Sequence, residues 1–328
     1  MVTRYAFRDS GHGAAMRHPL PLVIGSVAAA IVLTGCTAGN VPAATATVTT
    51  PAPSASAGLD TTAVRDAHRK LAALEQEYDA TVGVVATDTA TGESVAYNPD
   101  RRFGYASTLK AFAAAQFLGS VHGADRDELV HWTEADIARA GYSPVTEQHV
   151  ADGLTYMQLV DAAVRKSDNT ALNLVLQRIG GPKGLDDALT ELGDTTTEVV
   201  NDEPDLNTIE PGSTEDTTTP AAFTADLAKV LDGHTLNTAD IAQLLDWMSG
   251  NATGDTLIRA GAPKGWTVAD KSGGAGGIRN DIARVTRPDG DAIVISVLTT
   301  KNDPDEKYDD ALVAKSAAAV LGVFETGR

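Results

Sequence analysis

Apolar and polar positions along the chain repeat at spacings that predict an order of elements. From Thr61 to about Tyr78, apolar side chains recur at the spacing of one helix face. Two short strands are predicted next, over Thr81–Thr87 and Ser94–Tyr97, with a turn at Thr89–Gly92 between them. The folded part of the chain is therefore expected to begin with a helix and a hairpin.

The middle of the chain is predicted to be helical. Helical patterns cover Thr108–Leu118, a stretch after Thr155, Asn169–Ile179, Pro220–Leu231 and Asn237–Met248. Thr155 and Thr219 stand where N-cap residues belong, and Pro220 suits the first turn of a helix. The run Gly180-Gly181-Pro182 is expected to stop the helix before it.

The end of the chain returns to strands. Thr267–Ala269, Asp281–Val285 and Ala292–Leu298 are predicted strands, with a turn at Pro288–Gly290 and a final helix from about Glu306 to Val323. Strands at both ends with helices between them predict an α/β fold of the α+β type. We expect one antiparallel sheet flanked by the N- and C-terminal helices, with an all-α lobe inserted into it.

This organisation sets expected borders for the parts of the chain. An α/β lobe would comprise residues 59–102 and 256–328, and a helical lobe residues 103–255, with a cleft between the lobes as the natural place for a site.

Residues 1–58 lack the patterns of a folded domain that the rest of the chain shows. A basic start precedes an apolar run from Leu20 to Leu33, which is shorter than the ~20 residues of a membrane span and is typical of a secretory signal. The run ends Leu33-Thr34-Gly35-Cys36, which resembles a bacterial lipobox. Residues 1–36 are thus predicted to be a lipoprotein signal, beginning at Met1 or Met16, and Cys36 the lipidated residue. Residues 37–58 are rich in Thr, Ala, Pro and Ser and predict a flexible linker.

The composition of the chain limits which kinds of partner and cofactor the protein is expected to bind. Hydrophobic residues make up 43% of the 328 residues, which is enough for a sizeable core. Residues 59–328 carry 23 basic and 43 acidic side chains, a net charge of −20 that disfavours nucleic acid. The single cysteine permits no internal disulfide, and the seven histidines form no metal-ligand motif. We expect an exported protein at the outer face of the bacterial cytoplasmic membrane, held only by a lipid anchor; whether the protein is also released from this anchor stays open.

Three short motifs carry candidate chemistry. Ser107-Thr108-Leu109-Lys110 places a hydroxyl and an amine three residues apart, on one helical face, where the lysine can help remove the serine proton. Ser167-Asp168-Asn169 and Lys271-Ser272-Gly273 follow, the second at the end of a predicted strand. Taken singly, each motif also reads as an ordinary helix cap or turn.

In this order the three motifs resemble the signature of class A β-lactamases and penicillin-binding proteins. Glu203-Pro204-Asp205-Leu206-Asn207 is similar to a further class A segment, in which a carboxylate and an amide four residues apart hold one water. The resemblance covers nearly all of residues 60–328. It implies a monomeric enzyme without a cofactor or metal that opens a small-molecule β-lactam.

The resemblance also implies roles for individual residues. The catalytic residues would be Ser107 as the nucleophile, Lys110, Ser167 and Glu203, with the Ser107 proton leaving through either Lys110 or Glu203. Backbone N–H groups of Ser107 and Gly274 would stabilise the oxyanion. The expected substrate-binding residues are Asn169, Asn207, Lys271, Ser272, Gly273, Gly274, Tyr142 and Arg279, with Arg259 the rival of Arg279.

Asn201 is a departure from the pattern of many class A enzymes, which carry an arginine there, paired with the aspartate that matches Asp216. We therefore expect at best a hydrogen bond in place of an ion pair, and a more mobile loop. Two alternatives stay open at this point: a D-alanyl-D-alanine carboxypeptidase, which Glu203 and Asn207 disfavour, and a non-hydrolytic or slow penicillin-binding lipoprotein.

Overall fold

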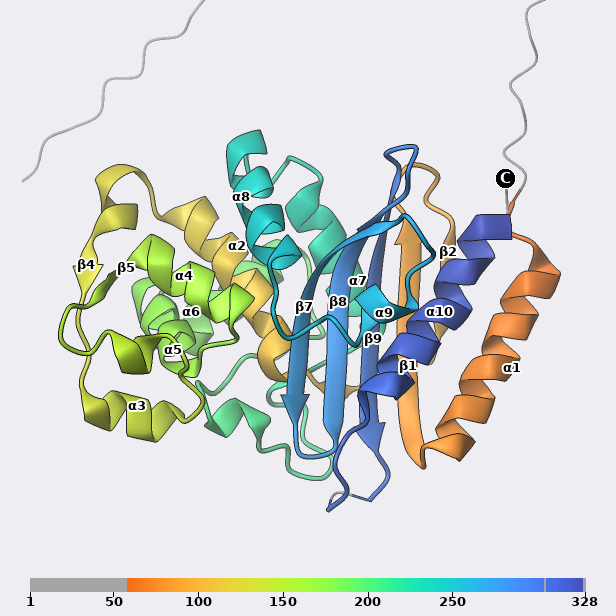
Figure 1. The fold of residues 1–328 in the computed structure, drawn as a ribbon, viewed down its shortest axis with the longest axis horizontal. Helices are drawn as coiled ribbons and strands as arrows, with labels where there is room; N and C mark the ends of the chain where they lie inside the picture. The colour runs from red at the N-terminus through yellow and green to blue at the C-terminus, as the bar shows by residue number, and fades with distance from the viewer. Residues whose placement is uncertain (1–57, 304, 327–328) are drawn as a thin grey trace, which may run out of the picture. The chain divides into compact units, whose positions relative to one another are not determined.

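A five-stranded antiparallel sheet is the centre of the structure, a computed structural model that describes residues 58–303 and 305–326 (Figure 1). The predicted signal, Cys36 and nearly all of the linker lie outside the described residues. The strand order is β2-β1-β9-β8-β7. The strands are β1 (Ala80–Asp88), β2 (Ser94–Tyr97), β7 (Thr267–Ala275), β8 (Ile278–Thr286) and β9 (Ala292–Lys301). Strands from both ends of the chain thus share one sheet, which confirms the predicted fold class.

Two long helices cover one face of this sheet. They are α1 (Thr61–Glu77) and α10 (Asp310–Thr326), which lie side by side in Figure 1, with the short α9 (Ile258–Gly261) near them. Buried Leu71 and Leu74 of α1 join Val313 and Val320 of α10 in one apolar cluster with the inward side chains of β1 and β9. Burial of apolar side chains between the helices and the sheet holds this lobe together.

The other face of the sheet carries α7 (Pro220–Leu231) and the helical lobe. That lobe contains α2 (Lys110–Ser120), α3 (Glu134–Ala140), α4 (Tyr156–Arg165), α5 (Asn169–Arg178), α6 (Gly181–Glu191) and α8 (Thr238–Ser249). Helix α2 is its central element, because most of its side chains are buried, including Phe112 and Phe117. Its run of alanines lets neighbouring helices approach closely, so this helix is a rigid support for the residues at its N-terminus.

Short elements complete the structure. They are the paired strands β3 (Phe103–Gly104) and β6 (Thr217–Thr218), the paired strands β4 (Leu129–Val130) and β5 (Leu154–Thr155), and the 3-10 helices η1 (Ala106–Leu109), η2 (Gly123–Asp127), η3 (Thr146–Gln148) and η4 (Asp205–Asn207). Among the described residues no helix is long and apolar enough to cross a membrane.

The predicted helix caps are where the sequence placed them. The Thr155 side chain accepts a hydrogen bond from Gln158 N, and Thr219, followed by Pro220, accepts one from Ala222 N. Gly180-Gly181-Pro182 also ends the helix before it as predicted, since α5 stops at Arg178 with Ile179 as its C-cap. Gly180 is a left-handed residue with φ +99° that caps α6, and Pro182 lies in the first turn of that helix.

Two boundaries differ from the prediction. The final helix begins at Asp310 rather than near Glu306. Strand β7 runs on to Ala275 instead of ending at Ala269, so Lys271–Gly273 lie within the strand and not at its end. The two glycines that follow Ser272 have a low strand propensity, so the sequence did not predict a strand there. In the structure each of them pairs with a residue of β8, Gly273 with Asn280 and Gly274 with Arg279.

Asp226 of α7 and Asp194, just after α6, form a buried pair of carboxyl groups. Burial and a hydrogen bond to Asp194 raise the pKa of Asp226 to about 8. Between about pH 4 and about pH 8, Asp226 is therefore protonated in the fold but ionised in the unfolded chain. The free energy of unfolding that this group contributes decreases as the pH rises through this range.

Asp226→Asn keeps a hydrogen bond to Asp194 without a titrating group. We expect its melting temperature to fall less than that of the wild type between about pH 5 and pH 8, measured by circular dichroism. Equal falls in both proteins would contradict this.

Candidate active site

A cleft with a volume of about 520 Å³ lies between strand β7 and the helical lobe. The predicted residues in its wall are Ser107, Tyr142, Ser167, Asn169, Glu203, Asn207, Ser272, Gly273, Gly274 and Arg279. The two predicted lysines, Lys110 and Lys271, lie beneath this wall with an exposed fraction of 0%. Segments far apart in the sequence therefore meet at one place.

Ser107 lies in the 3-10 helix η1, directly before α2 begins at Lys110. Although Ser107 precedes the α-helix, the serine and the lysine face each other, as the spacing of the motif predicts. Lys110 Nζ donates to Ser107 Oγ at 3.0 Å, to Ser167 O at 2.8 Å and to Asn169 Oδ1 at 2.6 Å. Ala106 has φ +46°, in the left-handed region that residues with a Cβ rarely adopt. Strain of this kind is found where a reactive residue is held in place.

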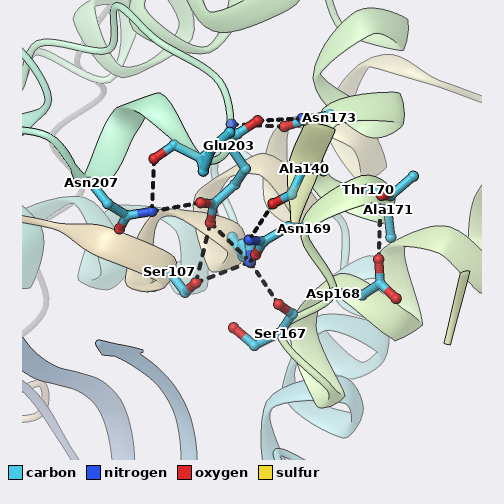
Figure 2. Close-up of polar contacts among 12 residues, drawn as sticks. Ser107, Ala140, Ser167, Asp168, Asn169, Thr170, Ala171, Asn173, Glu203 and Asn207 are labelled. Atoms are coloured by element: carbon cyan, nitrogen blue, oxygen red, sulfur yellow. Dashed lines mark hydrogen bonds and ion pairs between the residues drawn. The ribbon is translucent and has the colours of Figure 1, made fainter. Parts of the chain in front are cut away.

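Glu203 is buried and faces both Ser107 and Lys110. Its Oε1 is 3.4 Å from Ser107 Oγ and 3.1 Å from Lys110 Nζ. Asn207 Nδ2 donates to Glu203 Oε2 at 2.6 Å, and Figure 2 shows the Ser107 and Asn207 side chains both reaching the Glu203 carboxylate. Asn173 of α5 fixes the Glu203 backbone, since it donates to Glu203 O at 2.8 Å and accepts from Glu203 N at 2.9 Å. The carboxylate is therefore held from two sides.

The two buried lysines are close enough to affect each other. Burial lowers the pKa of Lys110, and the Glu203 carboxylate partly opposes this. Burial, followed by repulsion from Lys110, lowers the pKa of Lys271 to about 7. Lys271 Nζ donates to Ser167 Oγ at 3.1 Å and to Ser272 O at 2.7 Å. An amine with a lowered pKa next to a hydroxyl is suited to passing protons near neutral pH.

Asp168, the middle residue of the second motif, shapes the cleft without lining it. Its carboxylate accepts from Val145 N and Thr146 N, each at 2.9 Å, and from Ala171 N at 2.9 Å (Figure 2 shows the last). These bonds cap α5 and hold the loop that follows Tyr142. Tyr142 itself is 59% exposed at the cleft wall.

Of the two candidate arginines, Arg279 lines the cleft and Arg259 does not. Arg279 Nε lies 2.7 Å from Asp310 Oδ1, while the rest of its guanidinium faces the cleft side of β7 near Gly274. Arg259 instead pairs with Asp255 and the buried Asp270. Arg259 thus stabilises the segment beside the cleft.

Sequence reasoning missed several residues in the cleft wall, among them Thr253 and Tyr308, and also missed Asn173, which contacts the Glu203 backbone behind the wall. Asn173 could have been found, because it stands one helical turn after Asn169. Thr253, whose Oγ1 is 2.6 Å from Ser272 Oγ, and Tyr308, which lines the cleft, gave no signal. Among the described residues, no group of three or more His, Cys, Asp or Glu side chains is placed to hold a metal ion.

Asn201 makes the hydrogen bond expected of it. Its Nδ2 donates to Asp216 Oδ2 at 2.6 Å, and Tyr105 Oη donates to Asp216 Oδ1 at 2.6 Å. The backbone N–H groups of Val200 and Asn201 also donate to Oδ1, at 3.0 and 3.1 Å. The buried Asp216 carboxylate is therefore bound by neutral donors. The mobility of the loop stays a prediction.

Asn201→Arg is expected to raise the melting temperature by about 2–4 °C, because a guanidinium would pair with the buried Asp216 carboxylate. A better-ordered loop should also change kcat for bulky substrates more than for small ones. Differential scanning calorimetry and steady-state rates on both substrate types test this. An Asn201→Arg protein with wild-type melting and wild-type rates would show that this position does not control the loop.

Comparison with known proteins places this geometry in a family. Residues 66–324 match the Beta-lactamase enzyme family. The chain is 45% identical over 255 residues to a β-lactamase of Bacillus amyloliquefaciens, which covers 77% of this chain and 83% of the relative. It is 46% identical over 249 residues to a β-lactamase of Amycolatopsis lactamdurans, covering 76% and 82%.

A solved structure agrees with this result. The class A β-lactamase of Clostridium kluyveri superposes with a TM-score of 0.76 at 45% identity, covering 79% of this chain and 98% of that one. The fold and the cleft thus define a hydrolase scaffold of the β-lactamase type. The chain belongs to the class A β-lactamases, enzymes that hydrolyse the β-lactam amide.

Proposed function

We propose that this protein hydrolyses penicillins and cephalosporins through an acyl-enzyme on Ser107 and so protects the cell that exports it from these antibiotics. The observation that carries the proposal is the contact of one serine hydroxyl with both a buried lysine and a buried glutamate. Ser107 Oγ is 3.0 Å from Lys110 Nζ and 3.4 Å from Glu203 Oε1. Either group can take the serine proton.

In the acylation step, Ser107 Oγ would bond to the lactam carbonyl carbon while its proton passes to Glu203 or Lys110. The carbon–nitrogen bond then breaks, and Ser167 would deliver a proton to the leaving nitrogen, replenished from the Lys271 ammonium 3.1 Å away. Before deacylation, the Ser107 proton held by Glu203 or Lys110 would pass through Ser167 to Lys271, which replaces the proton given to the nitrogen and leaves Glu203 ionised.

The oxyanion of this step would lie between the N–H groups of Ser107 and Gly274. A Cβ at Gly273 would stand only 3.1 Å from Ser107 N and 2.9 Å from Tyr105 O, so a glycine is required for β7 to pack this closely against the nucleophile. The close packing brings the two proposed donors to the same part of the cleft. Such donors are typically worth ~10²–10³ in rate each.

In the deacylation step, Glu203 would take a proton from a water that attacks the ester carbonyl and give it to Ser107 Oγ as the ester bond breaks. Asn207 Oδ1 is buried and has no hydrogen-bond partner among the described residues, so it can accept a hydrogen bond from that water. This pair of side chains favours a hydrolase over the carboxypeptidase and over a slow penicillin-binding protein.

Substrate binding would use charges on the β7 side and an amide on the opposite side. Lys271, Ser272 and Arg279 would hold the substrate carboxylate. Asn169 Nδ2 donates one hydrogen to Ala140 O at 3.0 Å, which leaves its second hydrogen for the acylamino carbonyl of the substrate. Tyr142 would cover the substrate at the cleft wall.

Sustained turnover of a chromogenic cephalosporin by the purified protein, followed together with intact mass, tests the proposal. Many equivalents should be hydrolysed with little acyl-enzyme present. A single burst, with a stable mass increase on Ser107, would instead make the protein a penicillin-binding peptidase or sensor.

The export route is a second part of the proposal. Leu33-Thr34-Gly35-Cys36 would be cleaved before Cys36, leaving a diacylated cysteine that anchors the enzyme to the outer face of the membrane. Cys36→Ser should release the protein from the membrane fraction. A Cys36→Ser protein that stays membrane-bound would rule out lipidation at this residue.

A further inference from the structure

Tyr308 lies in the connection between β9 and α10 and forms part of the cleft wall. Among the described residues, Tyr142 at 59% and Tyr308 at 40% are the only exposed tyrosine, phenylalanine or tryptophan side chains. Both line the same cleft, Tyr142 from the helical lobe and Tyr308 from the sheet side. Exposed aromatic rings confined to one cleft indicate contacts with a ligand.

The Tyr308 ring is held in a fixed position. The guanidinium carbon of Arg279 is 4.8 Å from the ring centroid, a cation–π distance, and Asp310 Oδ1 forms an ion pair with Arg279 Nε at 2.7 Å. Tyr308 N also donates to Gly276 O at 3.3 Å, which ties the connection to the β7–β8 turn. One face of the Tyr308 ring therefore packs against Arg279, and another part of the ring is exposed in the cleft.

The ring edge is next to the backbone that would bind the reacting group. A Cβ at Gly274 would be 3.2 Å from Tyr308 Cε1 and 3.0 Å from an Arg279 guanidinium nitrogen. Gly274 is the proposed oxyanion donor and Arg279 a proposed carboxylate ligand. Whatever substituent lies beside the substrate carboxylate must therefore come close to Tyr308.

Cephalosporins carry such a substituent and penicillins do not. In a cephalosporin, the ring carbon that bears the carboxylate is doubly bonded to C3, whose substituent extends in the plane of that double bond. In a penicillin the corresponding neighbour is a carbon with two methyl groups. A planar ring at C3 could stack on the exposed part of Tyr308, whereas two methyl groups offer no such surface.

We propose that Tyr308 is a specificity-determining residue that favours cephalosporins with a heteroaromatic C3 substituent. The proposal rests on the β-lactam hydrolysis proposed above.

The test compares two cephalosporins with the same acylamino group, one with a methyl at C3 and one with a thio-linked heteroaromatic ring. The measured quantity is the ratio of their kcat/KM values, with the full-length protein. We expect Tyr308→Ala to lower the ratio of heteroaromatic to methyl substrate by about tenfold, the size of one lost aromatic contact. Tyr308→Phe retains the ring and should keep the wild-type ratio.

Tyr78→Ala is the matched control. Tyr78, at the end of α1, stacks with Lys315 at the same 4.8 Å but does not line the cleft. The Tyr78→Ala protein should have the same ratio of kcat/KM values for the two cephalosporins as the wild type. If Tyr308→Ala lowers kcat/KM equally for both cephalosporins, the ring only orders Arg279 and the proposal is wrong. A wild-type ratio in Tyr308→Ala also overturns it. If the wild type turns over neither substrate, the proposed function itself has failed.

Discussion

Glu203→Gln is expected to convert the protein from a turnover enzyme into a stable acyl-enzyme. Glutamine keeps the size of the side chain and can still contact Asn207 and Ser107, but it cannot accept the proton of the attacking water. We expect kcat to fall by about 10³-fold, within the usual range for loss of a general base. Intact mass spectrometry after mixing with a penicillin should show a lasting mass increase of one substrate.

The rate of that mass increase addresses the proton path that the sequence left open. If Lys110 takes the Ser107 proton, acylation in Glu203→Gln should stay close to the wild-type rate, whereas a slower acylation assigns that proton to Glu203. Asp205→Asn is the matched control, because it makes the same chemical change at an exposed carboxylate of the same loop and should retain wild-type kcat. Wild-type turnover by Glu203→Gln would refute the proposed deacylation.

Ser107→Ala is expected to remove turnover almost completely, by about 10⁶-fold, the effect typical of deleting a serine nucleophile. No mass increase should appear with any β-lactam. The fold should persist, because Lys110 and Glu203 still contact each other directly at 3.1 Å and neither is left without a partner. The melting temperature should therefore lie close to that of the wild type.

Ser120→Ala, at the exposed far end of α2, the helix that follows Ser107, is the control for this substitution. It should retain both activity and mass labelling. A Ser107→Ala protein that still forms a covalent adduct would place the nucleophile elsewhere.

Elements that depend on neighbouring residues were the most accessible to prediction. The α1 pattern, the hairpin β1–β2 and the cap Thr219-Pro220 each depend on residues within a few positions of one another, and all three are present. The extension of β7 past Ala269 was missed for the opposite reason. Its second half contains glycines, and only pairing with β8 makes it a strand.

The candidate site divides in the same way. The motifs around Ser107, Ser167 and Lys271 could be recognised because their residue types and order are specific to a known family. Asn173, which holds the Glu203 backbone, and Asp168, which holds the loop after Tyr142, act through contacts between segments that sequence spacing does not reveal.

The sequence by itself determined the fold class, the residues able to do chemistry and the departure at Asn201. It could do so because periodicity, helix caps and short motifs each depend on residues that are close together in the chain. Only the tertiary structure decided that Lys110 and Lys271 lie buried under the cleft, that Arg279 rather than Arg259 faces it, and that Tyr308 stands beside Gly274. Burial and distance between remote segments depend on how the two lobes pack, and they set the pKa values and contacts from which the chemistry follows.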